Sequence, residues 1–163
     1  MILIATVDEN WALSFQKSPL VQIPADQRFF RKETQGKTVI MGYRTLLSLP
    51  AGQPVLGREN IVLAPAGIKL PGSILHATSV SEVLSLVQGK KADEIYVTGG
   101  AGIYEAFLPY CHMAHITMVE YSYRADRYLT NLEKEPGWRR TGESDEQTYY
   151  DLTYHFVKYE KNS

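Results

Sequence analysis

The chain has 163 residues, a length that suits one domain with a sizeable hydrophobic core. Hydrophobic residues make up 44% of it and charged residues 21%, which is ordinary for a soluble globular protein, and no apolar run is long enough to span a bilayer. With 17 basic and 18 acidic residues the formal net charge is −1, so no broad field attracts nucleic acid or a membrane surface.

Short β-branched or aliphatic runs predict buried strands in the first two thirds of the chain. The expected strands are Ile2 to Val7, Thr38 to Met41, Ile61 to Leu63 and Glu94 to Thr98. The first run stops at Asp8 and Glu9, and no basic residue precedes it, so a strand fits this segment better than a signal peptide.

Helical segments separate these strands. Ala25 to Thr34 has helical length, and Pro24 suits its start. Val80 to Val87 follows Ser79, a residue that suits helix capping, and its apolar residues recur at core spacing. Because strands and helices alternate, we expect crossover connections and a mainly parallel sheet covered by helices on both faces.

The end of the chain has a different pattern. From Tyr150 to Val157, aromatic or aliphatic residues at even positions alternate with Asp151, Thr153, His155 and Val157, which suits an antiparallel strand with one wetter face. His115 to Glu120 predicts another strand, and Pro65 to Gly72 a surface loop. No repeat, low-complexity tract or composition break marks a linker, so we expect one domain over residues 1–163.

A glycine-rich junction follows the strand that ends at Thr98. Gly99, Gly100 and Gly102 lead into a helix that carries Ile103. Glycines let the backbone approach a ligand, and the free N–H groups of a helix start favour an anion. The spacing is no standard dinucleotide fingerprint, however, and on its own a tight strand-to-helix turn explains these glycines more simply than a phosphate site.

Asp26 lies in the first turn of the expected helix, and Phe30 lies on the same helical face four positions later. A first-turn Asp usually complements the helix dipole, which is the simpler explanation. An acid and a ring on one face would also line a pocket for a heteroaromatic ligand. Arg58 carries a fork that could bind a carboxylate, although most loop arginines bind none.

Other chemistries find little support in the residue pattern. The four histidines, His76, His112, His115 and His155, lack metal-ligand spacing, and no Ser-His-Asp order or paired-carboxylate pattern is present. We therefore expect neither a metal site nor hydrolase chemistry. The single cysteine, Cys111, excludes an internal disulfide framework, and the cytoplasm is the expected compartment.

Taken in order, these segments resemble the dihydrofolate reductase family across almost the whole chain. The matching segments are Asn10-Trp11-Ala12, Ile23-Pro24-Ala25-Asp26, Phe29-Phe30-Arg31, Val39-Ile40-Met41-Gly42, Gly57-Arg58-Glu59-Asn60-Ile61 and Val97-Thr98-Gly99-Gly100. The resemblance implies an α/β fold with a central, mostly parallel eight-stranded sheet, an antiparallel last strand and helices on both faces. It also implies that NADPH delivers hydride to C6 of 7,8-dihydrofolate, which gives tetrahydrofolate without a metal.

The resemblance implies roles in the substrate pocket for the residues that stand at matching positions. Asp26 would be the catalytic residue, binding the amidine edge of the pterin and supporting protonation of N5 through water. Phe30 would pack on the pterin and benzoyl rings, Arg58 would hold the α-carboxylate of the glutamate tail, and Thr117 would hydrogen-bond to Asp26. The other implied substrate-pocket residues are Ile4, Thr6, Gln27 and Leu49.

The cofactor side is implied in the same way. Gly99, Gly100, Ala101 and Gly102 would receive a phosphate, Tyr104 would lie near the nicotinamide, and Thr45 would cap the other phosphate-facing helix. The segment Glu9 to Val21 corresponds to a mobile loop that closes over the nicotinamide. The other implied cofactor-site residues are Thr6, Leu13, Ser14, Gly42, Tyr43, Arg44, Leu63, Ala64, Thr98 and Ile103.

Several positions depart from the family pattern. Tyr43 stands where an arginine usually meets the 2′-phosphate of the cofactor, and Ala64-Pro65 replaces polar residues. Arg44 could substitute, and we favour NADPH, but NADH use is a second hypothesis. The other departures are Leu13-Ser14 for Ile-Gly, Val21 for Trp, Gln27 for an apolar residue, and Ala125-Asp126-Arg127-Tyr128-Leu129 for Gly-Asp-Thr-x-Phe-Pro.

Two alternative functions remain at this point. One is a related pterin or pyrimidine reductase on the same fold, such as the reductase of riboflavin synthesis, which would depend only weakly on Arg58. The other is a noncatalytic nucleotide-binding protein, which the Leu13-Ser14 and Tyr43 departures favour and the retained Asp26 disfavours. The expected partner is a small folate substrate, with no nucleic acid and no membrane, and the expected state is a monomer.

Overall fold

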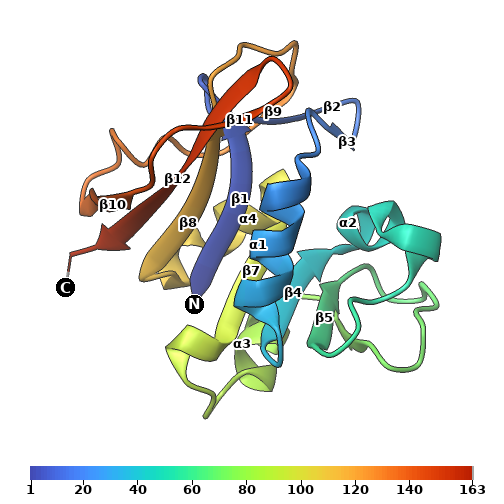
Figure 1. The fold of residues 1–163 in the computed structure, drawn as a ribbon. Helices are drawn as coiled ribbons and strands as arrows, with labels where there is room; N and C mark the ends of the chain where they lie inside the picture. Colours follow the sequence, from blue (N-terminus) through green and yellow to red (C-terminus); the bar gives the residue numbers. More distant parts are fainter. Residues whose placement is uncertain (163) are drawn as a thin grey trace.

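The computed structural model describes residues 1–162, and it confirms a central, mostly parallel sheet flanked by helices (Figure 1). Eight strands follow the order β10-β12-β8-β1-β7-β4-β5-β6, and a ninth, β11, pairs with β12. Their bounds are β1 Ile2–Asp8, β4 Thr38–Gly42, β5 Glu59–Leu63, β6 Leu75–Ala77, β7 Ile95–Gly99, β8 Met113–Val119, β10 Trp138–Glu143, β11 Gln147–Tyr149 and β12 Leu152–Lys161. The ninth strand is an addition to the expected eight.

The parallel and antiparallel parts of the sheet occupy opposite sides. β8, β1, β7, β4, β5 and β6 pair in parallel, whereas β12 runs antiparallel to β8, β10 and β11. The expected antiparallel strand is confirmed, but it begins at Leu152. Tyr150 instead lies in the turn before it, with φ 53° and 88% of its surface exposed. His155 and Val157, expected on the wetter face, are buried: Val157 packs in the larger core cluster, and His155 lies beside Glu143 of β10.

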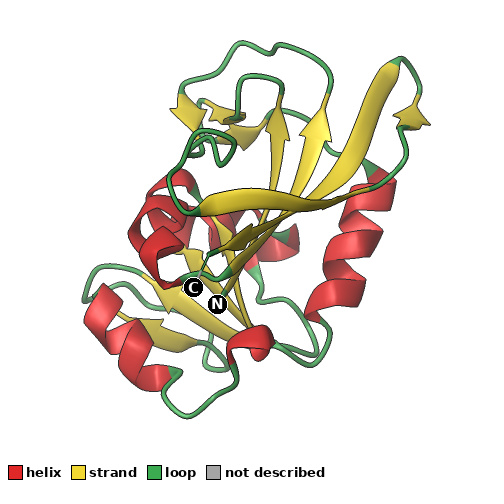
Figure 2. Cartoon of the chain, turned by 90° about the vertical axis from the view of Figure 1, so that its left-hand side faces the viewer, coloured by secondary structure: helices red, strands yellow, loops and turns green. Residues whose placement is uncertain are grey.

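Helices cover both faces of the sheet, as expected (Figure 2). Alternation along β1 explains the two layers: Ile2 and Ile4 pack with residues of α1 and α2, whereas Leu3 and Val7 pack with residues of α3 and α4. The helices are α1 Pro24–Thr34, α2 Tyr43–Ser48, α3 Val80–Leu86 and α4 Ala101–Phe107, and short 3-10 turns span Pro50–Gly52, Ala92–Glu94 and Leu108–Tyr110.

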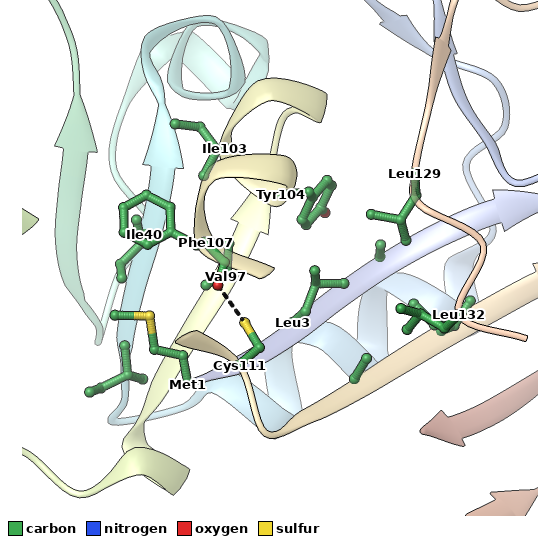
Figure 3. Close-up of a cluster of buried hydrophobic side chains, with 14 of the residues drawn as sticks. Met1, Leu3, Ile40, Val97, Ile103, Tyr104, Phe107, Cys111, Leu129 and Leu132 are labelled. Carbon is green, nitrogen blue, oxygen red and sulfur yellow. Dashed lines mark hydrogen bonds between the residues drawn. The ribbon is translucent and has the colours of Figure 1, made fainter. Parts of the chain in front are cut away.

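The larger core lies between α4 and the sheet (Figure 3). Phe107 and Val97 are fully buried there, beside Leu3 of β1. Cys111 is buried and free, and its thiol donates to the Phe107 carbonyl at 3.3 Å. This layer holds the start of α4 firmly against β7, which fixes the glycine junction between them.

A separate three-stranded sheet stands above the central one (Figure 1). It consists of β2 Ala12–Phe15, β3 Ser18–Pro19 and β9 Arg127–Tyr128, all antiparallel. The segment that corresponds to the mobile loop therefore forms a short hairpin paired with β9. No helix in the described residues has both the length and the apolar character needed to cross a membrane.

Candidate active site

Asp26 lies at the start of α1, above two threonines of the central sheet. Thr117 Oγ1 donates to Asp26 Oδ1 at 2.6 Å, and Thr6 Oγ1 donates to Oδ2. Thr6 and Thr117 are register partners on the parallel strands β1 and β8. Pro24 occupies the first turn of α1, which begins without a side-chain cap and leaves the Asp26 carboxylate to the threonines.

The surroundings of Asp26 change its acidity. Burial raises the pKa of its carboxyl, and the hydrogen bonds from Thr117 and Thr6 partly oppose that rise. Tyr104 lies on the other side, where its phenol donates to the Ile4 carbonyl at 2.7 Å, and burial together with the Asp26 charge raises the pKa of that phenol. The site thus contains one acid that exchanges its proton at a higher pH than an exposed aspartate does.

An apolar wall continues from Asp26 along α1. Phe30 and Leu49 are partly buried and pack on the core that includes Ile4. Gln27 directly follows Asp26 on α1, three positions before Phe30, and its side chain is exposed. The wall offers one partly exposed aromatic ring one turn beyond the acid.

Arg58 lies at the far end of α1. Its Nε donates to Thr34 Oγ1 at 3.2 Å, and its two terminal nitrogens donate to the carbonyls of Leu56 and Arg31. A guanidinium has five N–H groups, so these bonds leave two for another acceptor. Asp26 and Thr34 are about 12 Å apart along the helix axis, which separates the acid from the arginine by roughly the length of a small elongated ligand.

A cleft of about 1170 Å³ opens at the carboxyl ends of β4 and β7. All of the residues assigned to the cofactor side line it except Ala64, which is buried while its neighbour Pro65 lines the cleft. Of the residues assigned to the substrate side only Thr6 lines it, and Thr6 contacts Asp26. The cleft therefore reaches the acid through Thr6.

Two glycine turns pack against each other at the floor of this cleft. A Cβ on Gly42 would lie 3.0 Å from Ile103 Cγ1, and one on Gly99 would lie 3.4 Å from Thr45 Oγ1, with Gly99 at φ +129°. The close packing accounts for both glycines without a ligand. It also leaves backbone without side chains where β4 and β7 lead into α2 and α4, a fit for a bulky nucleotide across the strand ends.

The expected cap at Thr45 is wrong. The residue at the N-cap of α2 is Gly42, and no side chain caps this helix. Thr45 lies inside the first turn because the helix starts directly after β4, at Tyr43. Its hydroxyl instead faces the turn at Gly99 and Gly100.

Two aspartates attach the hairpin of β2 and β3. Asp8 Oδ1 accepts from the Asn10 and Ala12 backbone at 2.8 and 2.9 Å, and Oδ2 accepts from the Tyr123 backbone at 2.9 Å. Asp126 Oδ2 accepts from the Gln16 backbone at 3.0 Å. The only signal for Asp8 in the sequence is its place at the end of a strand, where an aspartate can start a side-chain-capped turn.

The mostly parallel strands end at a cleft that two glycine turns line, and one half-buried acid lies beside this cleft. This arrangement is that of a nucleotide-binding α/β protein. The chain belongs to the dihydrofolate reductase family, because the family model described as dihydrofolate reductase matches residues 1–161.

Individual relatives agree with this assignment. A dihydrofolate reductase of Bacillus subtilis (strain 168) is 31% identical over 164 residues, which cover 98% of this chain and 94% of that protein. One of Neisseria meningitidis serogroup A is 32% identical over 158 residues, which cover 96% and 95%. The solved structure of dihydrofolate reductase from Enterococcus faecalis complexed with NADP(H) and RAB-propyl has a TM-score of 0.86 at 19% identity, covering 99% of this chain and 96% of that one. This last likeness supports the fold alone.

Proposed function

We propose that this chain reduces 7,8-dihydrofolate with hydride from NADPH and produces tetrahydrofolate. The observation that carries the proposal is the half-buried Asp26, held by Thr6 and Thr117 at the end of a nucleotide-sized cleft, in a member of this family. NADPH, when bound, supplies the hydride. The protein then has to bind the pterin, orient it, exclude water and provide an acid route to N5.

Asp26 provides that acid route. Its ionised carboxylate binds the amidine edge of the pterin, and because burial raises its pKa it holds a proton more readily than an exposed aspartate does, so that a proton can reach N5 through water. Protonated N5 makes C6 a better hydride acceptor. Phe30, Ile4 and Leu49 supply the apolar wall for the ring system.

Arg58 binds the α-carboxylate of the glutamate tail. The bonds to Thr34, Leu56 and Arg31 hold its guanidinium in place before substrate arrives, so little further ordering is needed. This argues for a glutamate-tailed folate over the related reductase substrates. Gln27 is also assigned to the substrate pocket, because it is exposed beside Asp26 and lies three positions before Phe30 on α1.

The cleft would hold the cofactor. The turns at Gly42 and at Gly99 to Gly102, with Thr45 and Thr98, would bind its phosphates, and Tyr104, Leu13 and Ser14 would line the part that receives the nicotinamide; all of these residues line the cleft. Tyr43 and the exposed Arg44 line the cleft side by side, so Arg44 provides the cation for the 2′-phosphate. The hairpin of β2 and β3 covers this end and excludes water.

Steady-state kinetics test the proposal directly. Purified protein is mixed with dihydrofolate and either NADPH or NADH, and the loss of reduced nicotinamide absorbance is followed with and without an antifolate. We expect antifolate-sensitive turnover that is faster with NADPH. Equal or better catalytic efficiency with NADH would make the Arg44 assignment wrong, and nucleotide binding without turnover would favour a noncatalytic nucleotide-binding protein.

We further propose that the chain acts as a monomer in the cytoplasm. The residues assigned to the acid site and to the cofactor side lie together within one chain, which supports a monomer. The free, buried Cys111 suits a reducing compartment.

A further inference from the structure

Thr6 contributes a hydrogen bond that the proposed reaction does not itself require. Its hydroxyl donates to one oxygen of Asp26 while the Thr117 hydroxyl donates to the other, so each carboxylate oxygen has its own donor. The two residues are register partners in the sheet. Side chains of matched residues on neighbouring parallel strands lie on the same face, about 4.8 Å apart, which suits a carboxylate placed across them.

We propose that Thr6 is a positioning residue for Asp26, acting with Thr117 as a two-point clamp on the carboxylate. A carboxylate oxygen has two lone pairs, so a clamped Asp26 keeps one on each oxygen for a bidentate contact with the substrate. With one donor removed, the carboxylate is anchored at a single oxygen, and its terminal torsion becomes broad. The catalytic consequence rests on the proposed function, whereas the clamp is a feature of the folded protein itself.

The clamp also affects the acidity of Asp26. Burial raises the pKa of this carboxyl, and the hydroxyl of Thr6 is one of the two that oppose the rise. The ionisable neighbour packed against this site is Tyr104 of α4, and the contacts from β1 and β8 are neutral hydroxyls. Without the Thr6 hydroxyl, only the hydrogen bond from Thr117 counters the effect of burial on the pKa of Asp26. Asp26 should therefore keep its proton to higher pH.

Three variants distinguish the effect of the hydrogen bonds to Asp26 from the effect of side-chain packing. Thr6→Val removes the hydroxyl and keeps a β-branched side chain on the strand, Thr6→Ser keeps the hydroxyl and removes a methyl group, and Thr117→Val removes the opposite donor. The Asp26 carboxyl is titrated by NMR with carbon-labelled aspartate, with Asp26→Asn to assign its signal. The pH dependence of kcat/KM is measured on the same samples, and thermal unfolding checks the fold.

In Thr6→Val we expect the Asp26 titration midpoint to rise by roughly half a pH unit or more. The plateau of kcat/KM should fall by about three- to tenfold, while its alkaline limb moves to higher pH. Thr6→Ser keeps the donor, so its Asp26 titration midpoint should stay at the wild-type position, and Thr117→Val should move in the same direction as Thr6→Val.

An unchanged Asp26 titration in Thr6→Val would overturn the clamp, as would a serine variant that behaves like the valine variant. The NMR titration needs no turnover. If the wild type fails to reduce dihydrofolate, the proposed function fails while the titration still decides the clamp. If Thr6→Val does not fold, Thr6→Ala, which also lacks the donor, is titrated in its place.

Discussion

The carboxylates of Asp8 and Asp26 accept hydrogen bonds from two different kinds of donor. Asp8, at the root of the hairpin, is 1% exposed and accepts three backbone N–H groups, from Asn10, Ala12 and Tyr123. Asp26, in the acid site, accepts from the hydroxyls of Thr6 and Thr117. Both are carboxylates with hydrogen-bond donors on each oxygen, yet the donors differ in kind.

The difference decides what each carboxylate can do. A backbone N–H can only donate, so protonation or loss of the Asp8 carboxylate leaves buried donors without a partner. A hydroxyl can turn and accept, so Thr6 and Thr117 can satisfy Asp26 in both protonation states. The site at Asp8 therefore requires an acceptor on both carboxylate oxygens, whereas the site at Asp26 can keep its hydrogen bonds when a proton is exchanged.

The largest expected effect is the loss of activity in Asp26→Asn. Removing the acid route should lower kcat at neutral pH by about a thousandfold, measured by steady-state kinetics with dihydrofolate and NADPH. The asparagine can still form hydrogen bonds with both hydroxyls, so the fold should persist. Asp93→Asn, which changes an exposed carboxylate paired with His112, serves as the control and should keep wild-type turnover. Unchanged turnover in Asp26→Asn would exclude the assigned role.

The same variant has a defined effect on stability. Burial raises the pKa of Asp26 in the folded state, so the folded protein binds this proton more tightly than the unfolded chain. The contribution to stability is present in full below the unfolded pKa and is lost as the pH rises through the folded pKa. An uncharged asparagine has no such loss. Calorimetry at neutral pH should therefore give Asp26→Asn a Tm equal to or above that of the wild type.

Asp8→Asn should show the opposite pattern. The amide presents N–H donors toward backbone N–H groups, which should lower the free energy of unfolding by about 3 kcal/mol in urea denaturation. Exchange of the Asn10 and Ala12 amides should become faster. Asp126→Asn is the matched control, because this exposed aspartate accepts a single backbone bond from Gln16 and should lose less than about 1 kcal/mol. Equal losses in the two variants would remove Asp8 as the anchor of the hairpin.

The parallel core was predictable because its strands are short apolar runs. The expected strands at residues 2–7, 38–41 and 61–63 are confirmed, and the structure extends each by one or two residues. The small sheet was not predicted, because β3 and β9 have two residues each and β2 pairs with a segment more than a hundred residues away. β6 was missed because two of its three residues are exposed.

The acid site was only partly predictable. Helical spacing placed Asp26 and Phe30 on one face, but nothing in the spacing of the sequence links Thr6 with Thr117, since their proximity depends on the register of β1 and β8. The family resemblance supplied both residues to the pocket. The structure adds that they bind the two oxygens of one carboxylate.

Arg58→Gln tests whether Arg58 binds the α-carboxylate of the glutamate tail. Loss of the guanidinium should raise KM for dihydrofolate by about tenfold or more with little change in kcat, because the tail carboxylate loses a charge-assisted partner far from the reacting atoms. A pterin substrate without the glutamate tail should show no such difference between variant and wild type. Arg28, an exposed arginine on α1, provides the comparison as Arg28→Gln. A weak dependence on Arg58 would favour the related pterin or pyrimidine reductase.

The smallest expected effect concerns the cofactor side, where Tyr43 replaces an arginine. Tyr43→Arg should raise the ratio of kcat/KM for NADPH over NADH by about five- to tenfold, because a second guanidinium beside Arg44 adds a bidentate partner for the 2′-phosphate. Arg44→Gln should lower the same ratio, and the rate with NADH should stay close to that of the wild type in both variants. If Arg44→Gln leaves the ratio unchanged, the 2′-phosphate does not depend on this side of the cleft. Any preference for NADPH would then come from other cations that line the cleft, such as Lys17 of the hairpin or Arg127 of β9.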